Sequence, residues 1–121
     1  MRSKRVLVVE DQVDNRQILH DLLTNAGFDI VEAENGEEAI ASAQASRPDL
    51  ILMDIQLPIL DGYEATRRLK ADPDLKSIPI IAVTSYALSS DEEKARLAGS
   101  DDYVAKPFSP RQLLAKIKEY V

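Results

Sequence analysis

The stretch Asp49-Leu-Ile-Leu-Met-Asp54 decides the fold of this chain, because it places four consecutive apolar residues between two aspartates. A continuous apolar run of this length is typical of a strand that is buried on both faces, as in a parallel sheet. The carboxyl ends of such strands are where doubly wound sheets bind their ligands. Asp54 is therefore predicted to end a buried strand and to be a functional residue.

Strand and helix patterns alternate on both sides of this run. Further strands are predicted over 4–9, 28–33, 78–83 and 102–105. Helices are predicted over 13–26, 37–46, 61–70, 90–99 and 110–121. With right-handed crossovers, this (βα)5 alternation predicts an α/β fold: a doubly wound, five-stranded parallel sheet in the order 2-1-3-4-5, the flavodoxin-like topology.

Local signals refine these elements. One apolar face of the first helix is predicted from its spacing: Ile18, Leu19, Leu22, Leu23 and Ala26. Asn35-Gly36 is interpreted as a turn. Capping-box patterns begin at Asp61 and Ser90, and Ser109-Pro110 is typical of the start of a helix.

Length and composition limit the possible functions. The 121 residues predict one domain over 1–121, and the absence of cysteine excludes disulfides and thiolate chemistry. A net charge of −6 argues against binding nucleic acid or an anionic membrane. The apolar run Val6–Val9 is too short for a signal peptide or a membrane span, so we expect a cytoplasmic protein.

Polar residues follow all five predicted strands, and the second strand, followed by Glu34, would lie at the edge of the sheet. Glu10 and Asp11 follow the first strand, Asp54 the third, Thr84 the fourth and Lys106 the fifth. Because parallel strands end at one edge of the sheet, we expect these side chains to meet there. Three neighbouring carboxylates repel one another unless a cation lies among them, and all-oxygen ligands suit Mg²⁺.

A lysine beside such a cation site is a poor metal ligand but a good partner for a phosphoryl group. The hydroxyl of Thr84 can donate one more hydrogen bond. The set therefore predicts phosphoryl transfer, with the central Asp54 as the nucleophile.

Five motifs in this order resemble the response-regulator receiver domain of bacterial two-component signalling, and the resemblance covers essentially the whole chain. They are Val8-Val-Glu-Asp11, Pro48-Asp-Leu-Ile-Leu-Met-Asp54, Leu57-Pro-x-x-Asp-Gly62, Ala82-Val-Thr-Ser85 and Tyr103-Val-Ala-Lys-Pro-Phe108. The resemblance implies that Asp54 accepts a phosphoryl group from a histidine kinase or a histidine phosphotransfer protein. It implies that Mg²⁺ is bound by Asp11, Asp54 and the backbone carbonyl of Gln56, with Glu10 acting through water.

The resemblance also implies a switch. Lys106 and Thr84 would hold phosphoryl oxygens, and Tyr103 would turn inward and alter the face made by the fourth helix, fifth strand and fifth helix. The Lys106–Pro107 peptide would be cis, and a kinase would dock near Asn15 and the Pro107 loop. Gln56 and Tyr86 occupy the two positions that tune the phosphoryl lifetime in the family. Glu10 departs from the Asp-Asp pair of many relatives, which changes its water-mediated contact with the metal.

Each residue also has a purely structural interpretation. Asp11 could cap the helix that follows, Thr84 could be a turn hydroxyl, and Lys106 could be a loop lysine. Tyr103 could be half-buried packing, and His20 is expected at the surface and not as a ligand. The convergence of these residues at one edge favours the functional interpretation.

Three other functions fit the sequence less well. A flavin-binding domain of this topology needs an anion-binding loop after the first strand, where Glu10 and Asp11 stand instead. An aspartyl-phosphate hydrolase needs a second acid two residues after the nucleophile, and that residue is Gln56. An inert scaffold with the receiver fold would need none of four residues that are present here: Asp11, Asp54, Thr84 and Lys106.

The expected context is a stand-alone receiver, with a module of a longer regulator or hybrid kinase as the alternative. Cell-cycle phosphorelays and chemotaxis are the two expected pathways. The predicted partners are a histidine kinase or phosphotransfer protein and a downstream protein target. The chain is expected to be a monomer or a phosphorylation-dependent dimer, and to catalyse its own phosphorylation and dephosphorylation without being a turnover enzyme.

Overall fold

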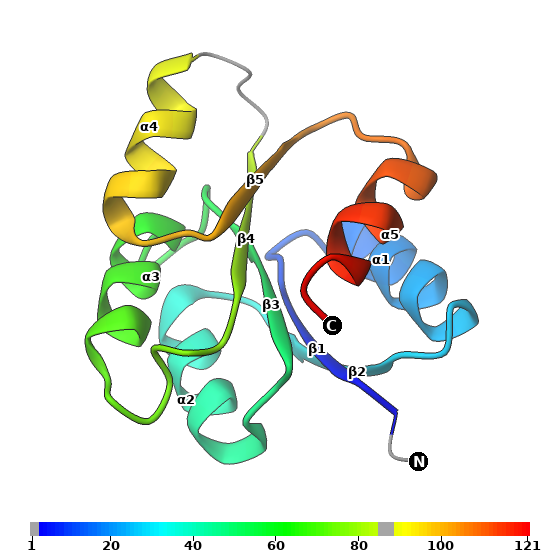
Figure 1. Ribbon diagram of the computed structural model, residues 1–121, viewed down its shortest axis with the longest axis horizontal. Helices are drawn as coiled ribbons and strands as arrows, with labels where there is room; N and C mark the ends of the chain where they lie inside the picture. The colour runs from blue at the N-terminus through cyan, green and yellow to red at the C-terminus, as the bar shows by residue number, and fades with distance from the viewer. Residues whose placement is uncertain (1–2, 85–88) are drawn as a thin grey trace.

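The computed structural model describes residues 3–84 and 89–121, and within these ranges five strands alternate with five helices (Figure 1). The strands are β1 Arg5–Val9, β2 Asp29–Ala33, β3 Leu50–Asp54, β4 Ile80–Thr84 and β5 Asp102–Ala105. The helices are α1 Val13–Asn25, α2 Gly36–Ser46, α3 Gly62–Ala71, α4 Ser89–Ala98 and α5 Pro110–Lys118. Every predicted element is present, with ends that differ from the prediction by at most a few residues.

The strands form one parallel sheet in the order β2-β1-β3-β4-β5. This confirms the predicted doubly wound α/β fold. Every residue of β3 is buried, as its continuous apolar sequence predicted. Since all five strands run the same way, their carboxyl ends gather at a single edge of the sheet.

The helices form a layer on each face of the sheet (Figure 1). On one face α1 and α5 cover a core that includes Leu23, Leu113 and Ile117. On the other face α2 and α3 cover a second core, and α4 packs through Ala95 against Ile55 and Ala82. None of the described helices has both the length and the apolar character needed to span a membrane.

Two local predictions were wrong. Asn35-Gly36 is not a turn that lies between the strand and the helix. The Asn35 side chain accepts a hydrogen bond from the amide of Glu38 and caps α2, whose first residue is Gly36. The face of α1 is narrower than predicted: Leu19 and Leu23 are buried, whereas Ile18 is 63 % exposed and Ala26 is also exposed.

The other start signals have mixed outcomes. Asp61 caps α3 through the amide of Glu64, and a full capping box joins Ser109 and Gln112 at the start of α5. Helix α4 begins at Ser89, and the predicted cap at Ser90 lies outside the described side chains.

Candidate functional site

Acidic side chains meet at the carboxyl edge of the sheet. Glu10 and Asp11 follow β1, and Asp54 ends β3, which pairs directly with β1. One carboxylate oxygen from each of the three lies within 4.8 Å of the others. Glu10 is 1 % and Asp54 6 % exposed, while Asp11 is half-buried and leaves the cluster open to solvent.

This cluster fits a small, hard cation. Its donors are carboxylate oxygens, which Mg²⁺ prefers, and no sulfur or imidazole competes among them. The loop after β3 adds Gln56, whose amide donates a 3.1 Å hydrogen bond to Oδ1 of Asp54. The residue predicted to offer a backbone carbonyl is thereby tied to the central carboxylate.

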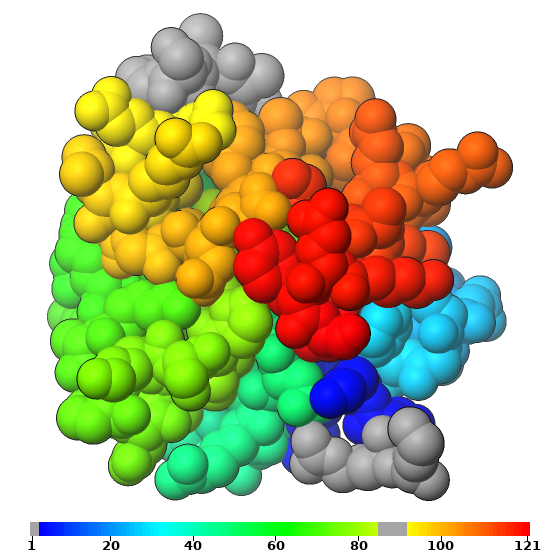
Figure 2. Space-filling model, in the orientation of Figure 1, coloured from blue at the N-terminus to red at the C-terminus, as the bar shows by residue number. Residues whose placement is uncertain are grey.

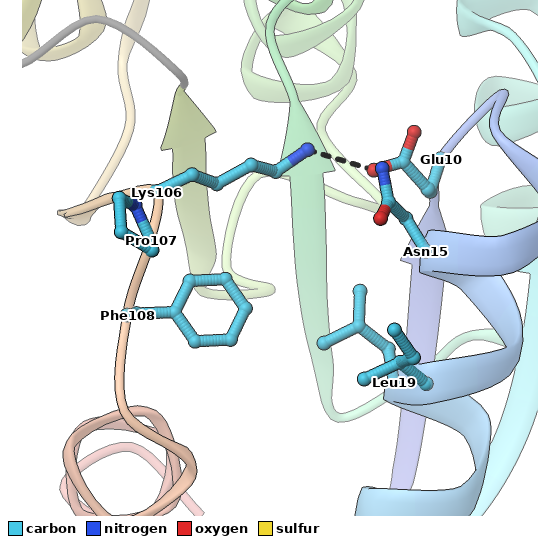
Figure 3. A pocket seen from close by; sticks show the side chains of 7 residues that line it. Glu10, Asn15, Leu19, Lys106, Pro107 and Phe108 are labelled. Carbon is cyan, nitrogen blue, oxygen red and sulfur yellow. Dashed lines mark hydrogen bonds and ion pairs between the residues drawn. The ribbon is translucent and has the colours of Figure 1, made fainter.

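Lys106 reaches into the cluster from the end of β5 (Figure 3). Its Nζ lies 2.8 Å from Oε1 of Glu10 and 3.4 Å from Oδ2 of Asp54. One ammonium group thus serves two buried carboxylates, with the closer contact to Glu10. The longer glutamate side chain, where many relatives have aspartate, makes a direct ion pair with Lys106.

The electrostatics of the two buried carboxylates differ. Burial and the neighbouring Glu10 charge raise the pKa of Asp54 to about 6. Burial alone would raise the pKa of Glu10, but the hydrogen bond from Lys106 holds that pKa below its usual value. Burial would lower the pKa of Lys106, and its contacts with Glu10 and Asp54 raise it instead. Asp11 has a raised pKa from burial and from Glu10.

Two glycines shape the loop that carries Gln56. The amide of Gly62 donates to the carbonyl of Ile55 over 3.0 Å, and the amide of Gly36 donates to the carbonyl of Leu60 over 3.1 Å. A Cβ at Gly62 would overlap the backbone carbonyl of Asp54, and one at Gly36 would overlap the carbonyl of Leu60. The loop after Asp54 can close this tightly only because both residues lack a side chain.

Two other predicted residues lie along β4 and β5. Thr84 ends β4, is 1 % exposed, and its carbonyl accepts a 2.6 Å hydrogen bond from the amide of Lys106. Tyr103 is half-buried and packs against the cluster of Ile55, Ala82 and Ala95. Tyr86, predicted to tune the lifetime, lies outside the described residues.

The structure excludes one of the purely structural interpretations, that Asp11 caps the helix that follows it. Gln12, not Asp11, is the residue before α1, and no side chain caps that helix. His20 is partly exposed, with Nδ1 4.0 Å from Oε1 of Glu32. The Lys106–Pro107 peptide is cis, as the resemblance implied.

A pocket of about 460 Å³ opens beside the acidic cluster (Figure 3). Glu10 and Lys106 line one end, and Pro107 and Phe108 face α1 across it. From α1 the lining residues are Asn15, Ile18 and Leu19. The exposed Ile18 therefore has an apolar surface next to it, which accounts for an isoleucine at this exposed position of α1.

The model of the family described as the response regulator receiver domain matches residues 6–118. The chain belongs to this family. Its members are signalling regulators that interact with histidine kinases or phosphotransfer proteins and with downstream targets, and they are not turnover enzymes. The receiver is 44 % identical to the polar-differentiation response regulator DivK of Brucella anthropi over 98 % of this chain and 96 % of that protein.

Solved structures give the same result. The receiver domain of a sensor histidine kinase from Pseudomonas aeruginosa, crystallised with a magnesium ion in its active-site cleft, is 38 % identical with a TM-score of 0.92, over 98 % of each chain. The chemotaxis protein CheY4 of Vibrio cholerae is 28 % identical with a TM-score of 0.93, over 99 % of this chain and all of that one.

Sequence reasoning missed two residues near the receiver's site. Arg16 contacts the backbone of Glu10, and Ile18 lines the pocket. Ile18 is next to the buried Leu19 in the sequence, and the apolar pattern of this helix does not distinguish it from a core residue. Arg16 could have been suspected from its distance of six residues from Glu10, less than two helical turns.

Proposed function

We propose that this receiver accepts a phosphoryl group on Asp54 from a phosphohistidine, with Mg²⁺ as cofactor, and passes on the signal by changing the surface that it offers to a protein target. The observation that carries the proposal is the shared lysine: a single half-buried ammonium lies between Asp54 and a second carboxylate at the edge of the sheet. The three carboxylates share one ammonium, and a bound cation would balance the excess negative charge before the phosphoryl group arrives.

In the proposed step a carboxylate oxygen of Asp54 attacks phosphorus, and an acyl phosphate forms as the phosphorus–nitrogen bond of the phosphohistidine breaks. The bonding pair returns to the imidazole nitrogen. Asp54 suits this role because Gln56 and Lys106 hold its two oxygens from different sides. Catalysis here consists of positioning and charge neutralisation.

Asp11, Asp54 and the carbonyl of Gln56 would hold Mg²⁺, with Glu10 acting through water. When bound, the metal supplies charge neutralisation between the carboxylates and the incoming phosphoryl oxygens. Lys106 is a flexible ammonium that can leave one carboxylate and pair with a phosphoryl oxygen. Hydrolysis of the acyl phosphate would return Asp54 to its first state, and Gln56 offers no second carboxylate to speed that step.

The proposed switch runs from Thr84 to the surface. Thr84 would move to hold a phosphoryl oxygen, and Tyr103 would turn inward behind it. Figure 2 shows α4, β5 and α5 next to one another on one face of the molecule. Tyr103 lines a shallow pocket between β5 and α5 on this face, so a change in its position would alter what a protein target meets there.

The pocket beside the acidic cluster is the proposed docking site for the phosphodonor. It joins apolar surface from Ile18 and Phe108 to the end of the cluster at Lys106. A helix that carries a phosphohistidine could pack an apolar face there while the phosphoryl group reaches Asp54. The chain would act as one cytoplasmic receiver domain over residues 1–121.

Mass spectrometry tests the proposal. Incubation with Mg²⁺ and a small phosphodonor should add the mass of one phosphoryl group to the wild type and none to Asp54→Asn. Omitting Mg²⁺ should abolish the gain. An equal gain in Asp54→Asn, or no gain in the wild type, would refute phosphorylation at Asp54.

A further inference from the structure

Arg16 binds the back of the acidic cluster. Its Nη1 donates a 3.0 Å hydrogen bond to the backbone carbonyl of Glu10. Its Nη2 lies 3.2 Å from Oε1 of Glu34, and its Nε lies 3.6 Å from Oε1 of Glu32. The Arg16 side chain is 14 % exposed, so it is largely packed between α1 and the end of β2.

These contacts fix one peptide unit. The carbonyl of Glu10 belongs to the peptide bond that joins Glu10 to Asp11, and the amide of Glu10 is held by the carbonyl of Ala33 over 3.0 Å. Because a peptide group is planar, holding its carbonyl also fixes the direction in which Asp11 leaves the strand. The amide of Gln12 then donates to Oε2 of Glu10 over 3.1 Å and orients that side chain.

The guanidinium group is suited to this task. Its planar group can donate to the carbonyl of Glu10 on one side. On the other side it reaches Glu32 of β2 and Glu34, which follows just after β2. An ammonium could make only one of these contacts with the same geometry. Lys106 binds the carboxylate of Glu10, whereas Arg16 binds the backbone carbonyl of Glu10 and has no contact with the carboxylates of the cluster among the described interactions.

We propose that Arg16 is a positioning residue for the cation site: it holds the Glu10–Asp11 peptide in the orientation in which Glu10 and Asp11 face Asp54. The inference rests on the proposed function, since it assigns a role toward the cation that this function requires. Groups that orient metal ligands from behind typically change metal affinity by about 10- to 100-fold when they are removed.

The test is magnesium binding by the unphosphorylated chain, followed through amide shifts in NMR titrations of the wild type, Arg16→Lys and Arg16→Met. Both variants should bind Mg²⁺ on the order of 10-fold more weakly. Before metal is added, the amides of Asp11 and Gln12 should exchange with solvent faster in the variants. At saturating Mg²⁺, the rate of phosphorylation by a small donor should return close to that of the wild type.

Arg5→Met is the matched control. Arg5 begins β1, the strand that ends just before Glu10, and its Nη1 also donates to a backbone carbonyl, that of Ser46 over 2.9 Å, but at the opposite end of the sheet. It should lower the melting temperature without weakening Mg²⁺ binding. Equal Mg²⁺ affinity in the wild type and Arg16→Lys, or equal weakening in Arg5→Met, would refute the role of Arg16.

Failure of the wild type itself to bind Mg²⁺ would refute the proposed function, and this inference with it. Arg16→Lys keeps the charge and most of the aliphatic stem, so it decides the question even if Arg16→Met does not fold.

Discussion

At the residue scale, the surroundings of Asp54 disfavour the ionised form of its carboxyl group. It is 6 % exposed, it lies beside Glu10, and it shares Lys106 with that glutamate at the longer of the two distances. Burial and the Glu10 charge raise its pKa to about 6. A group with a raised carboxyl pKa stabilises the fold when protonated and loses that contribution as it ionises.

The direction of this pKa shift predicts how Asp54→Asn changes stability in metal-free buffer. In the wild type the contribution of Asp54 is complete below about pH 4 and is lost as the pH rises through about 6. The asparagine keeps an acceptor for the amide of Gln56 and carries no charge. Asp54→Asn should therefore be more stable than the wild type at pH 7.5, by up to about 3 kcal/mol, with the gain vanishing below pH 4.

Urea unfolding from pH 4 to 8 measures this effect. The matched control is Asp29→Asn, at an exposed position of β2, which should change stability little at any pH. Mg²⁺ should reverse the order, because it stabilises the state that binds it and the wild type binds it better. A variant no more stable than the wild type at pH 7.5 would contradict the electrostatic conflict at Asp54.

The sequence could predict which strand ends carry polar residues, because strand ends follow from apolar runs and turn residues. It could not predict that Lys106 lies closer to Glu10 than to Asp54, since that depends on side-chain conformations across 96 residues of separation. The contact of Arg16 with the Glu10 carbonyl spans only six residues, but it too depends on a side-chain conformation. The contacts of long, flexible side chains can be determined only when the positions of the backbone around them are known.

At the element scale, the loop between β3 and α3 depends on close backbone packing. Gly62 begins α3 with its backbone packed against the carbonyl of Asp54, so a side chain at this position would press on the end of the strand that carries the nucleophile. Gly36 begins α2 and holds the same loop at Leu60. A turn was expected at Asn35-Gly36 because this pair is common in turns. That Asn35 caps α2 could not be predicted without knowing where the helix begins.

Gly62→Ala should therefore affect the site as well as the fold. The new methyl group must displace the backbone at Asp54 or Ile55, so we expect a loss of about 1–3 kcal/mol in stability and slower phosphorylation by a small donor. Phosphorylation kinetics at saturating Mg²⁺ and urea unfolding measure the two effects.

Gly27→Ala is the matched control for the loop. Gly27 has φ of 94°, which disfavours alanine, but nothing lies within 4 Å of an added Cβ. This variant should lose about 1 kcal/mol, because alanine is strained at such a φ, and phosphorylate at the normal rate. If both variants phosphorylate equally at matched stability, the packing of Gly62 has no special role in the site.

The exposed side of α1 gives a second prediction at this scale. Ile18→Asp places a charge in the apolar pocket between α1 and Phe108, and Leu97→Asp places the same charge on α4, where the leucine is 79 % exposed. Phosphotransfer from a phosphohistidine protein should slow at least tenfold in Ile18→Asp only, while transfer from a small donor stays normal in both. Equal transfer rates from the protein donor would exclude this pocket as its docking site.

At the scale of the whole molecule, one parallel sheet joins the acidic cluster to the α4–β5–α5 face. Asp54 is paired in register with Val83 of β4, and Thr84 of β4 is paired with Ala105, the residue before Lys106. Lys106 thus belongs both to the cluster and, through its backbone, to the strand that carries Tyr103. The order of the strands was predictable from alternation and handedness, whereas the half-buried packing of Tyr103 required the positions of α4 and β5.

This connection gives the last prediction, for the response to an added phosphoryl group. A group of charge about −2 should draw Lys106 away from Glu10 and change the packing of Tyr103 against Ala95 of α4. In amide NMR spectra with Mg²⁺ and beryllium fluoride, a phosphoryl mimic, shifts should extend along β4, β5 and α4. The β2 edge and the far end of α2 should change little.

Two variants separate the switch from simple binding. Asp54→Asn should show no shifts on adding the mimic, which assigns the response to that carboxylate. Lys106→Met keeps Asp54 but removes the group that links the cluster to β5, so shifts should remain near Asp54 and weaken at Tyr103 and α4. A Lys106→Met variant that transmits the full response would show that the signal reaches the surface through β4 and Thr84 alone.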